Sequence, residues 1–215
     1  MTLALVRGNE SNKQYPELLR DVARERSLYD SVDDLIAPEN LQQLTGDDVT
    51  SVRCTPMEGG FSGSRLLAVE TNGNRPQRLV LKRIVRQTDW NMQATNDYAC
   101  RSVALWQHGL LDRLRPTVDH AILACARDGD GWAILMRDVS PNLMGREAWS
   151  EAEIKYFLDA LVTIHATFWD APELSNPAIG LCDTTTMIQA LSVETARRLP
   201  SDTSSAPSGA QTVRR

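Results

Sequence analysis

The 215-residue sequence lacks long hydrophobic runs, and this absence limits where the protein can act. Near its start, residues 3–6 form an apolar run of only four, too short for the core of a signal peptide or for a membrane span. We therefore expect a cytoplasmic protein. Charge of one sign is also scarce, because 23 basic and 28 acidic residues give a net charge of −5 without a long run of either sign. This balance predicts neither a nucleic acid nor a membrane as a partner.

Cysteine is sparse as well, and its placement argues against two common cysteine chemistries. The four cysteines, Cys54, Cys100, Cys125 and Cys182, form no C-x-x-C pair, and no histidine stands beside them at ligand spacing. We therefore expect neither a zinc site nor a thioredoxin-like motif. We interpret the cysteines as free thiols that fill space in a core, as unpaired cysteines commonly do.

What the sequence does contain is a clear succession of strand-like and helix-like patterns. The patterns predict five strands, mostly antiparallel to their neighbours, at residues 49–54, 66–69, 79–85, 121–126 and 132–139. They predict helices at residues 13–45, 91–114, 150–169 and 184–198. Residues 200–215 are rich in Ser, Pro and Gly and have no face that could pack. The predicted fold class is α+β, with one helix between the third and fourth strands of a five-stranded antiparallel sheet and a helical layer after it.

The helix predicted at residues 150–169 begins with a capping box formed by Ser150 and Glu153. Its apolar face includes Leu158, Leu161 and His165, so we interpret His165 as a core histidine and not as a catalytic base. Too few helices follow to bury this face, which predicts poor solubility, a protein partner or a chain cut short. A truncation or a frameshift is our hypothesis for the low-complexity end.

The stretch MEGGFSGSRLLAVE, residues 57–70, places three glycines and two serines before a predicted strand. Backbone amides approach phosphate oxygens closely only where no Cβ intervenes, and a lysine beneath them completes a phosphate-binding cradle. Lys82, in LVLKRI on the third predicted strand, is the candidate for that lysine. A plainer interpretation stays open, in which the glycines make only a hairpin turn and Lys82 protects a sheet edge.

Four segments, GGFSGSRLLAV, LVLKR, WAILMRDVS and ALVTIHATFWD, follow one another within residues 46–170. In this order they resemble the nucleotide loop, the strand-three lysine, the interlobe hinge and the first carboxy-terminal-lobe helix of the aminoglycoside phosphotransferase and choline kinase-like family. That family has a protein-kinase-like fold. The resemblance implies a nucleotide-binding lobe at residues 46–140 and a partial helical lobe at 141–199, and the residue patterns outside it predict a helical extension at 1–45 and a disordered tail at 200–215.

The resemblance also implies which residues would bind ATP. The loop would cover the phosphates, Lys82 would bind the α and β phosphates, and the hinge backbone would face the adenine. The loop residues are Gly59, Gly60, Ser62, Gly63 and Ser64, and the hinge residues are Leu135, Met136 and Arg137. Mg²⁺ would accompany the ATP, and a small-molecule hydroxyl would accept the γ-phosphate.

The sequence departs from the family pattern at the positions that the family uses for phosphoryl transfer. Ser102 stands where the pattern leads us to expect the glutamate that pairs with the lysine, and on a continuous helix Asp97 would lie about 140° away from it. None of His108, His120 and His165 is followed by an aspartate two residues later, so the H-x-D-x4-N loop is missing, and we find no metal ligands.

Three hypotheses about function follow. The chain is an ATP-dependent small-molecule phosphotransferase truncated before its catalytic loop, or it is a catalytically silent nucleotide-binding or interaction protein. The third hypothesis is an unrelated α+β domain with a flexible turn.

Overall fold

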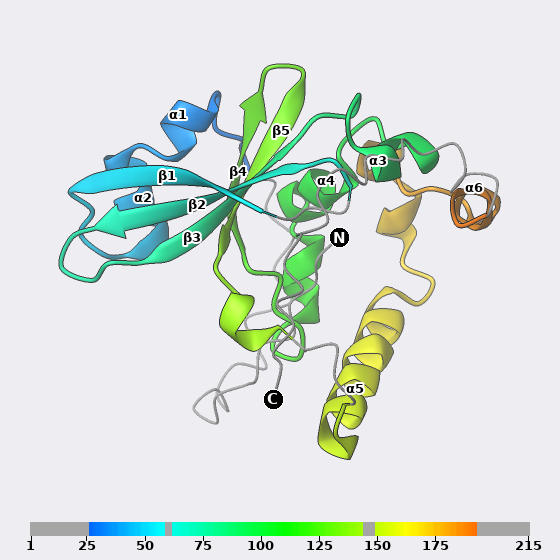
Figure 1. Cartoon of the computed structure of the whole chain (residues 1–215). Coiled ribbons are helices and arrows are strands. Elements are labelled where there is room, and N and C mark those ends of the chain that lie inside the picture. Colours follow the sequence, from blue (N-terminus) through cyan, green and yellow to red (C-terminus); the bar gives the residue numbers. More distant parts are fainter. Residues whose placement is uncertain (1–25, 59–61, 144–148, 193–215) are drawn as a thin grey trace, which may run out of the picture.

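The computed structural model describes residues 26–58, 62–143 and 149–192. Within these residues the protein is an α+β fold with one five-stranded antiparallel sheet and six α-helices, which confirms the predicted class. Figure 1 shows the sheet with α1 and α2 at one side of the molecule and with α3 to α6 at the other.

The sheet has the order β1-β2-β3-β5-β4, so the last strand in the chain lies between the third and the fourth. Its strands are β1 (Ser51–Met57), β2 (Arg65–Asn72), β3 (Arg78–Ile84), β4 (Ile122–Asp128) and β5 (Gly131–Arg137). The register pairs Leu81 of β3 with Leu67 on one side and with Leu135 on the other. All three side chains therefore lie on one face of the sheet, because pairing residues in neighbouring strands share a face.

The predicted strand at residues 49–54 is displaced and longer in the structure. β1 continues through Pro56, which pairs with Leu67, and ends at Met57. A proline fits here because β1 is an edge strand with only one neighbour, so the missing N–H removes no necessary ladder bond. The predicted turn between β4 and β5 is confirmed, with Gly129 at a φ of +57°.

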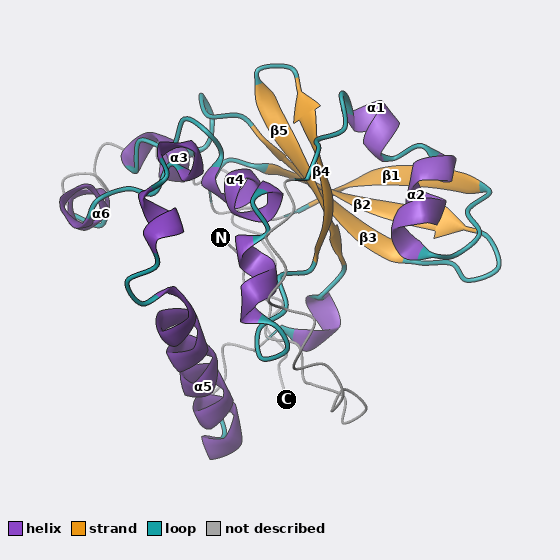
Figure 2. Cartoon of the chain, turned by 180° about the vertical axis from the view of Figure 1, so that it is seen from behind, coloured by secondary structure: helices purple, strands orange, loops and turns teal. Residues whose placement is uncertain are grey.

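Two short helices precede the sheet and add to its core. They are α1 (Val32–Leu35) and α2 (Pro38–Thr45), and Figure 2 shows α2 in front of β1 to β3. Pro38 starts α2, and Gly46 ends it with a φ of +74°, both favoured positions for these residues. Leu35 and Leu41 are fully buried in the core that contains the sheet residues Val69, Leu79 and Leu81.

The single helix predicted at residues 91–114 is wrong, because the segment forms three shorter elements. They are α3 (Trp90–Ala94), α4 (Arg101–Gln107) and the 3-10 helix η2 (Leu110–Leu114). Asn96 and Cys100 have positive φ angles of 51° and 55°, and Gly109 has a φ of 66°, so the backbone leaves the helical region at each junction. The apolar positions of the prediction are nevertheless buried: Val103, Trp106, Leu110 and Leu114.

The helix α5 (Glu151–Phe168) has the predicted capping box at Ser150. It is buried only at Ala160, which packs with Leu114 and Val118. Figure 1 shows α5 extending away from the sheet. Its large exposed apolar residues, including the residue just after it, are Ile154, Leu158, Leu161, Val162 and Trp169.

The interpretation of His165 as a core histidine is wrong, because its side chain is exposed. The helix α5 packs through Ala160, Ile164 and Phe168, whereas His165 shares the outer face with Leu158 and Leu161.

The remaining elements are short. They are the 3-10 helices η3 (Ser140–Asn142), η4 (Pro172–Ser175) and η5 (Pro177–Ile179) and the helix α6 (Thr184–Ala190). α6 ends earlier than the predicted residue 198, because Leu191 is already its C-cap. The predicted tail at residues 200–215 and the start of the predicted helix at 13–45 lie outside the described residues. In the part of the chain that is described, no helix combines the length and the apolar character needed to cross a membrane.

Candidate functional site

The end of the glycine stretch lies against the segment that connects β3 to α3. Gly59 and Gly60 fall outside the described residues, and the description resumes at Ser62. Gly63 has a φ of +88°, and a Cβ built on it would lie 2.1 Å from the carbonyl oxygen of Thr88. Only glycine fits this position, because both its backbone conformation and the space around it exclude a side chain.

The two serines around Gly63 bond a buried carboxylate. The hydroxyls of Ser62 and Ser64 donate to Oδ2 of Asp89 at 2.7 Å and 2.8 Å. The backbone N–H of Trp90 donates to the carbonyl of Ser62 at 3.0 Å, which adds a main-chain link between the two segments. Asp89 is 3% exposed, and its Oδ1 accepts the N–H of Met92, so the same side chain caps α3.

Lys82 lies on β3, where it pairs with Leu66 of β2 and Ile134 of β5. Its side chain is partly exposed. Across the described ranges, no acceptor or carboxylate lies within bonding distance of its ammonium group. Its charge is therefore able to bind an anion from solution.

Three charged side chains influence the pKa of the buried Cys100 thiol, at the start of α4. Burial raises its pKa to about 12, and among the charges around it Asp97 and Asp89 raise the pKa while Lys82 lowers it. Lys82, Asp89 and Asp97 therefore all lie near the start of α4. The thiol itself stays protonated at neutral pH and is not a nucleophile. Cys125 is buried too, but Cys54 is exposed, so the prediction of core cysteines is wrong for Cys54.

Asp97 would lie on the wrong face of the continuous helix that the sequence predicts. In the structure it precedes α4, and both of its carboxylate oxygens accept the N–H of Arg101, at 3.0 Å and 2.9 Å. It is 6% exposed. Because the predicted helix is broken before Cys100, the angular objection no longer applies, and the charges of Asp97 and Lys82 both act on the thiol of Cys100.

The predicted hinge residues form the end of β5. Leu135 and Met136 pair with β3 on one side and with β4 on the other. The N–H of Arg137 donates to Ala121, and its guanidinium pairs with Asp119. A central strand uses its backbone groups in two ladders, so the first backbone free of the sheet begins after Arg137. The contact with adenine stays a prediction for these three residues.

An open pocket of about 550 Å³ lies elsewhere, at the end of α5, and none of the predicted nucleotide-binding residues lines it. Its lining residues are Ile164, His165, Phe168, Trp169, Asp170 and Leu174. Among the described residues, no group of three or more His, Cys, Asp or Glu side chains is arranged to hold a metal ion.

Comparison with family models, with curated proteins and with solved structures finds no match to this chain. The site therefore has to be interpreted from its own chemistry. The structure brings Ser62, Gly63 and Ser64 together with Asp89, a residue that no sequence pattern singled out. Among the described residues Lys82 has no bonding partner, and its charge acts on the thiol of Cys100 together with the charges of Asp89 and Asp97.

Proposed function

We propose that this chain binds a nucleoside triphosphate, with Lys82 on β3 as the residue that contacts the phosphates. The observation that carries the proposal is that Lys82 is partly exposed and that its ammonium group has no bonding partner among the described residues. An ammonium group binds phosphate as a compact charge with three N–H donors, and it needs no further protein partner to do so.

The arrangement around Lys82 supports this proposal. Ser62 and Ser64 bond Asp89, and the charges of Asp89 and Lys82 both act on the thiol of Cys100, which supports a place for the lysine near the end of the glycine stretch. Small residues therefore occur where a phosphate could approach the backbone and where a positive charge is available.

The element order agrees with the family that the sequence resembles. A strand, the glycine stretch, a second strand and a third strand with Lys82 are followed by helices and then by the β4–β5 hairpin. On this basis we assign the chain to the nucleotide-binding lobe of a protein-kinase-like small-molecule phosphotransferase. The proposed lobe comprises residues 46–140.

The proposal is binding without phosphoryl transfer by this chain. Transfer needs an aspartate that orients the acceptor hydroxyl and ligands that hold Mg²⁺. The sequence contains no H-x-D motif. Turnover of Mg-ATP with a small alcohol or sugar that disappears in Lys82→Met would replace this proposal with the kinase hypothesis.

Thermal unfolding with and without Mg-ATP tests the binding. A ligand at 100 times its Kd stabilises the folded state by about 2.7 kcal/mol, which corresponds to a rise in Tm of roughly 5 to 10 °C for a domain of this size. Lys82→Met keeps the apolar stem of the side chain and removes the charge, so we expect it to fold and to lose the shift.

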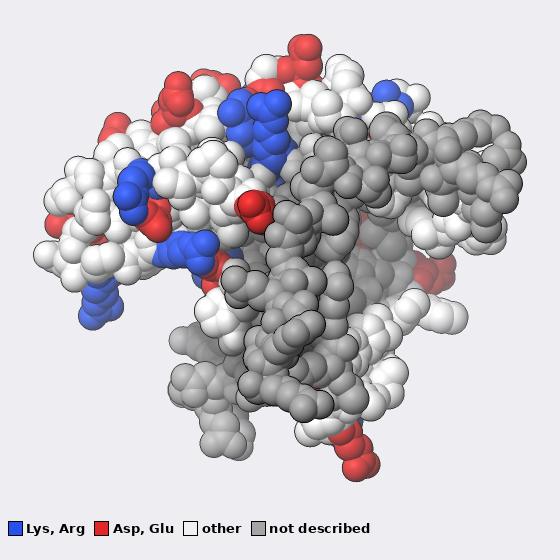
Figure 3. Space-filling view, in the orientation of Figure 1, with Lys and Arg blue, Asp and Glu red and all other residues white. Residues whose placement is uncertain are grey.

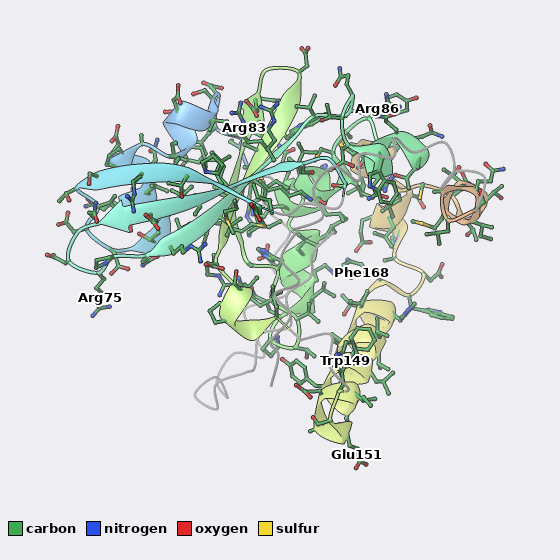
Figure 4. The ribbon with its side chains drawn as sticks, in the orientation of Figure 1. Arg75, Arg83, Arg86, Trp149, Glu151 and Phe168 are labelled. Carbon is green, nitrogen blue, oxygen red and sulfur yellow. The ribbon has the colours of Figure 1, made fainter. Side chains whose placement is uncertain are left out.

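The matched control is Arg75→Met. Arg75 is 82% exposed in the loop between β2 and β3, and Figure 4 shows it at the outer end of the sheet, far from α4. It should keep the wild-type shift. The proposal fails if Mg-ATP leaves the wild-type Tm unchanged or shifts both variants equally. Inorganic triphosphate as a second ligand separates binding of any polyanion from binding of the nucleotide.

One face of the described residues can be checked for a competing anion site. On the face drawn in Figure 3, the described basic and acidic side chains are interspersed, and no broad patch of one sign is visible. A non-specific response to anions is therefore not what we expect from this face.

A further inference from the structure

Ser62 and Ser64, on either side of Gly63 in the glycine stretch, both bond the same carboxylate oxygen, Oδ2 of Asp89, through their hydroxyls. The two hydroxyls also lie 3.1 Å apart, within hydrogen-bond distance of each other. We propose that Ser62 and Ser64 are positioning residues that fasten the glycine stretch to Asp89, and that they are not ligands of the phosphates. This inference rests on the nucleotide-binding function proposed above and refines it.

The chemistry of the site opposes a role as phosphate ligands. A phosphate oxygen needs a hydrogen-bond donor, and each serine hydroxyl has one hydrogen, for which Asp89 and the other serine are already the acceptors. Ser64 is 6% exposed and Asp89 is 3% exposed, so neither meets solvent where a phosphate would arrive. A phosphate placed against these hydroxyls would also lie next to a carboxylate of the same charge.

The fastening has several parts that act together. Besides the hydroxyl bonds, the N–H of Trp90 donates to the carbonyl of Ser62, and Gly63 lies close to the carbonyl of Thr88. Asp89 also accepts the N–H of Met92 through its other oxygen, so the glycine stretch and the start of α3 are held by one side chain. A loop held in place before the ligand arrives has less entropy to lose on binding.

The first test needs no nucleotide and follows single amides by hydrogen exchange with NMR. In Ser64→Ala the fastening weakens, and we expect the Trp90 amide to exchange about tenfold faster or more, because a hydrogen bond to a charged group is lost. The Met92 amide should keep its wild-type rate, since its bond to Oδ1 of Asp89 is intact. Thr88→Ala is the matched control, because its hydroxyl donates to Val85 in the same segment but not to Asp89.

The second test measures the Kd for Mg-ATP in Ser64→Ala, in Asp89→Asn and in the double variant. Asparagine keeps one oxygen for the N–H of Met92 and replaces the oxygen that accepts from the serines with an NH2 group, which cannot accept a hydrogen bond. A positioning role predicts that each single change weakens binding about 3- to 10-fold and that the double variant loses no more than either, since all three disrupt one unit.

A role as phosphate ligand predicts a different pattern. Asp89→Asn would then strengthen binding, because a negative charge beside the phosphates disappears, and the loss in Ser64→Ala would add to it independently. Either of these results overturns the proposal, and so does a Trp90 amide that exchanges at the same rate in Ser64→Ala as in the wild type. If the wild type binds no Mg-ATP, the proposed function fails, and the exchange of Trp90 alone then decides whether the fastening exists.

Discussion

Replacement of Gly63 by alanine is the sharpest test of how the glycine stretch is held. An alanine at a φ of +88° costs about 1 to 2 kcal/mol from its backbone conformation alone. Its Cβ would also stand 2.1 Å from the Thr88 carbonyl oxygen, which is backbone and cannot rotate away. The stretch must then move, and the serine bonds to Asp89 weaken or break. We expect a total loss of about 3 to 4 kcal/mol in the free energy of unfolding.

Gly129→Ala provides the control, because Gly129 also has a positive φ, of +57°, but no atom lies within 4 Å of the position that a Cβ would take there. It should lose only about 1 to 2 kcal/mol. Urea denaturation followed by circular dichroism measures the free energy of unfolding of both variants. In thermal unfolding the Tm of Gly63→Ala should be roughly 5 °C below that of Gly129→Ala. Equal stabilities of the two variants would refute the tight approach of Gly63 to Thr88 and the fastening that depends on it.

The remaining predictions concern acid stability and packing. Burial raises the pKa of Asp119, but the hydrogen bond and charge of Arg137 and the charge of Arg115 outweigh it and leave the pKa below its ordinary value. A carboxyl of this kind stabilises the fold above its unfolded pKa and loses that contribution as the pH falls through its folded pKa. Asp119→Asn should therefore be less stable than the wild type near about pH 7, and urea denaturation should find the difference shrinking toward about pH 3; a constant difference contradicts the ion pair. Leu81→Ala, at a side chain that is 1% exposed, should cost about 3 kcal/mol, whereas Leu158→Ala, at 52% exposed, should change stability by about 0.5 kcal/mol or less. Similar losses in these two variants would contradict the packing described for α5.

Local sequence patterns predicted the sheet well because strand alternation and turn chemistry are properties of neighbouring residues. The Gly129 turn and the capping box at Ser150 are examples, since both depend on residues a few positions apart. The helix at residues 91–114 failed for the opposite reason. Its apolar period was correct, but the backbone leaves the helix at Asn96 and Cys100, which have positive φ angles. Asparagine tolerates this conformation, whereas cysteine has no such preference, so the apolar period alone gave no sign of the break at Cys100.

The sequence predicted only those parts of the candidate site that have an unusual local composition. The glycines and Lys82 stand out in the sequence, whereas Asp89 looks like an ordinary helix cap before Trp90. Its bonds to Ser62 and Ser64 span 27 and 25 residues, and no local pattern encodes contacts of that range. The same limit explains His165, because an apolar face predicts burial only if another element packs against it.

The central place of β5 has a consequence for the newly made chain. Strand β3 can find its second neighbour only after residues 85–130 and then β5 have been synthesised. At about 5 to 20 residues per second, translation leaves the backbone of Arg78–Ile84 without that neighbour for a few seconds. A pause of the ribosome before Gly131 lengthens this interval and favours pairing between two nascent chains, which would lower the yield of folded protein without changing its final stability.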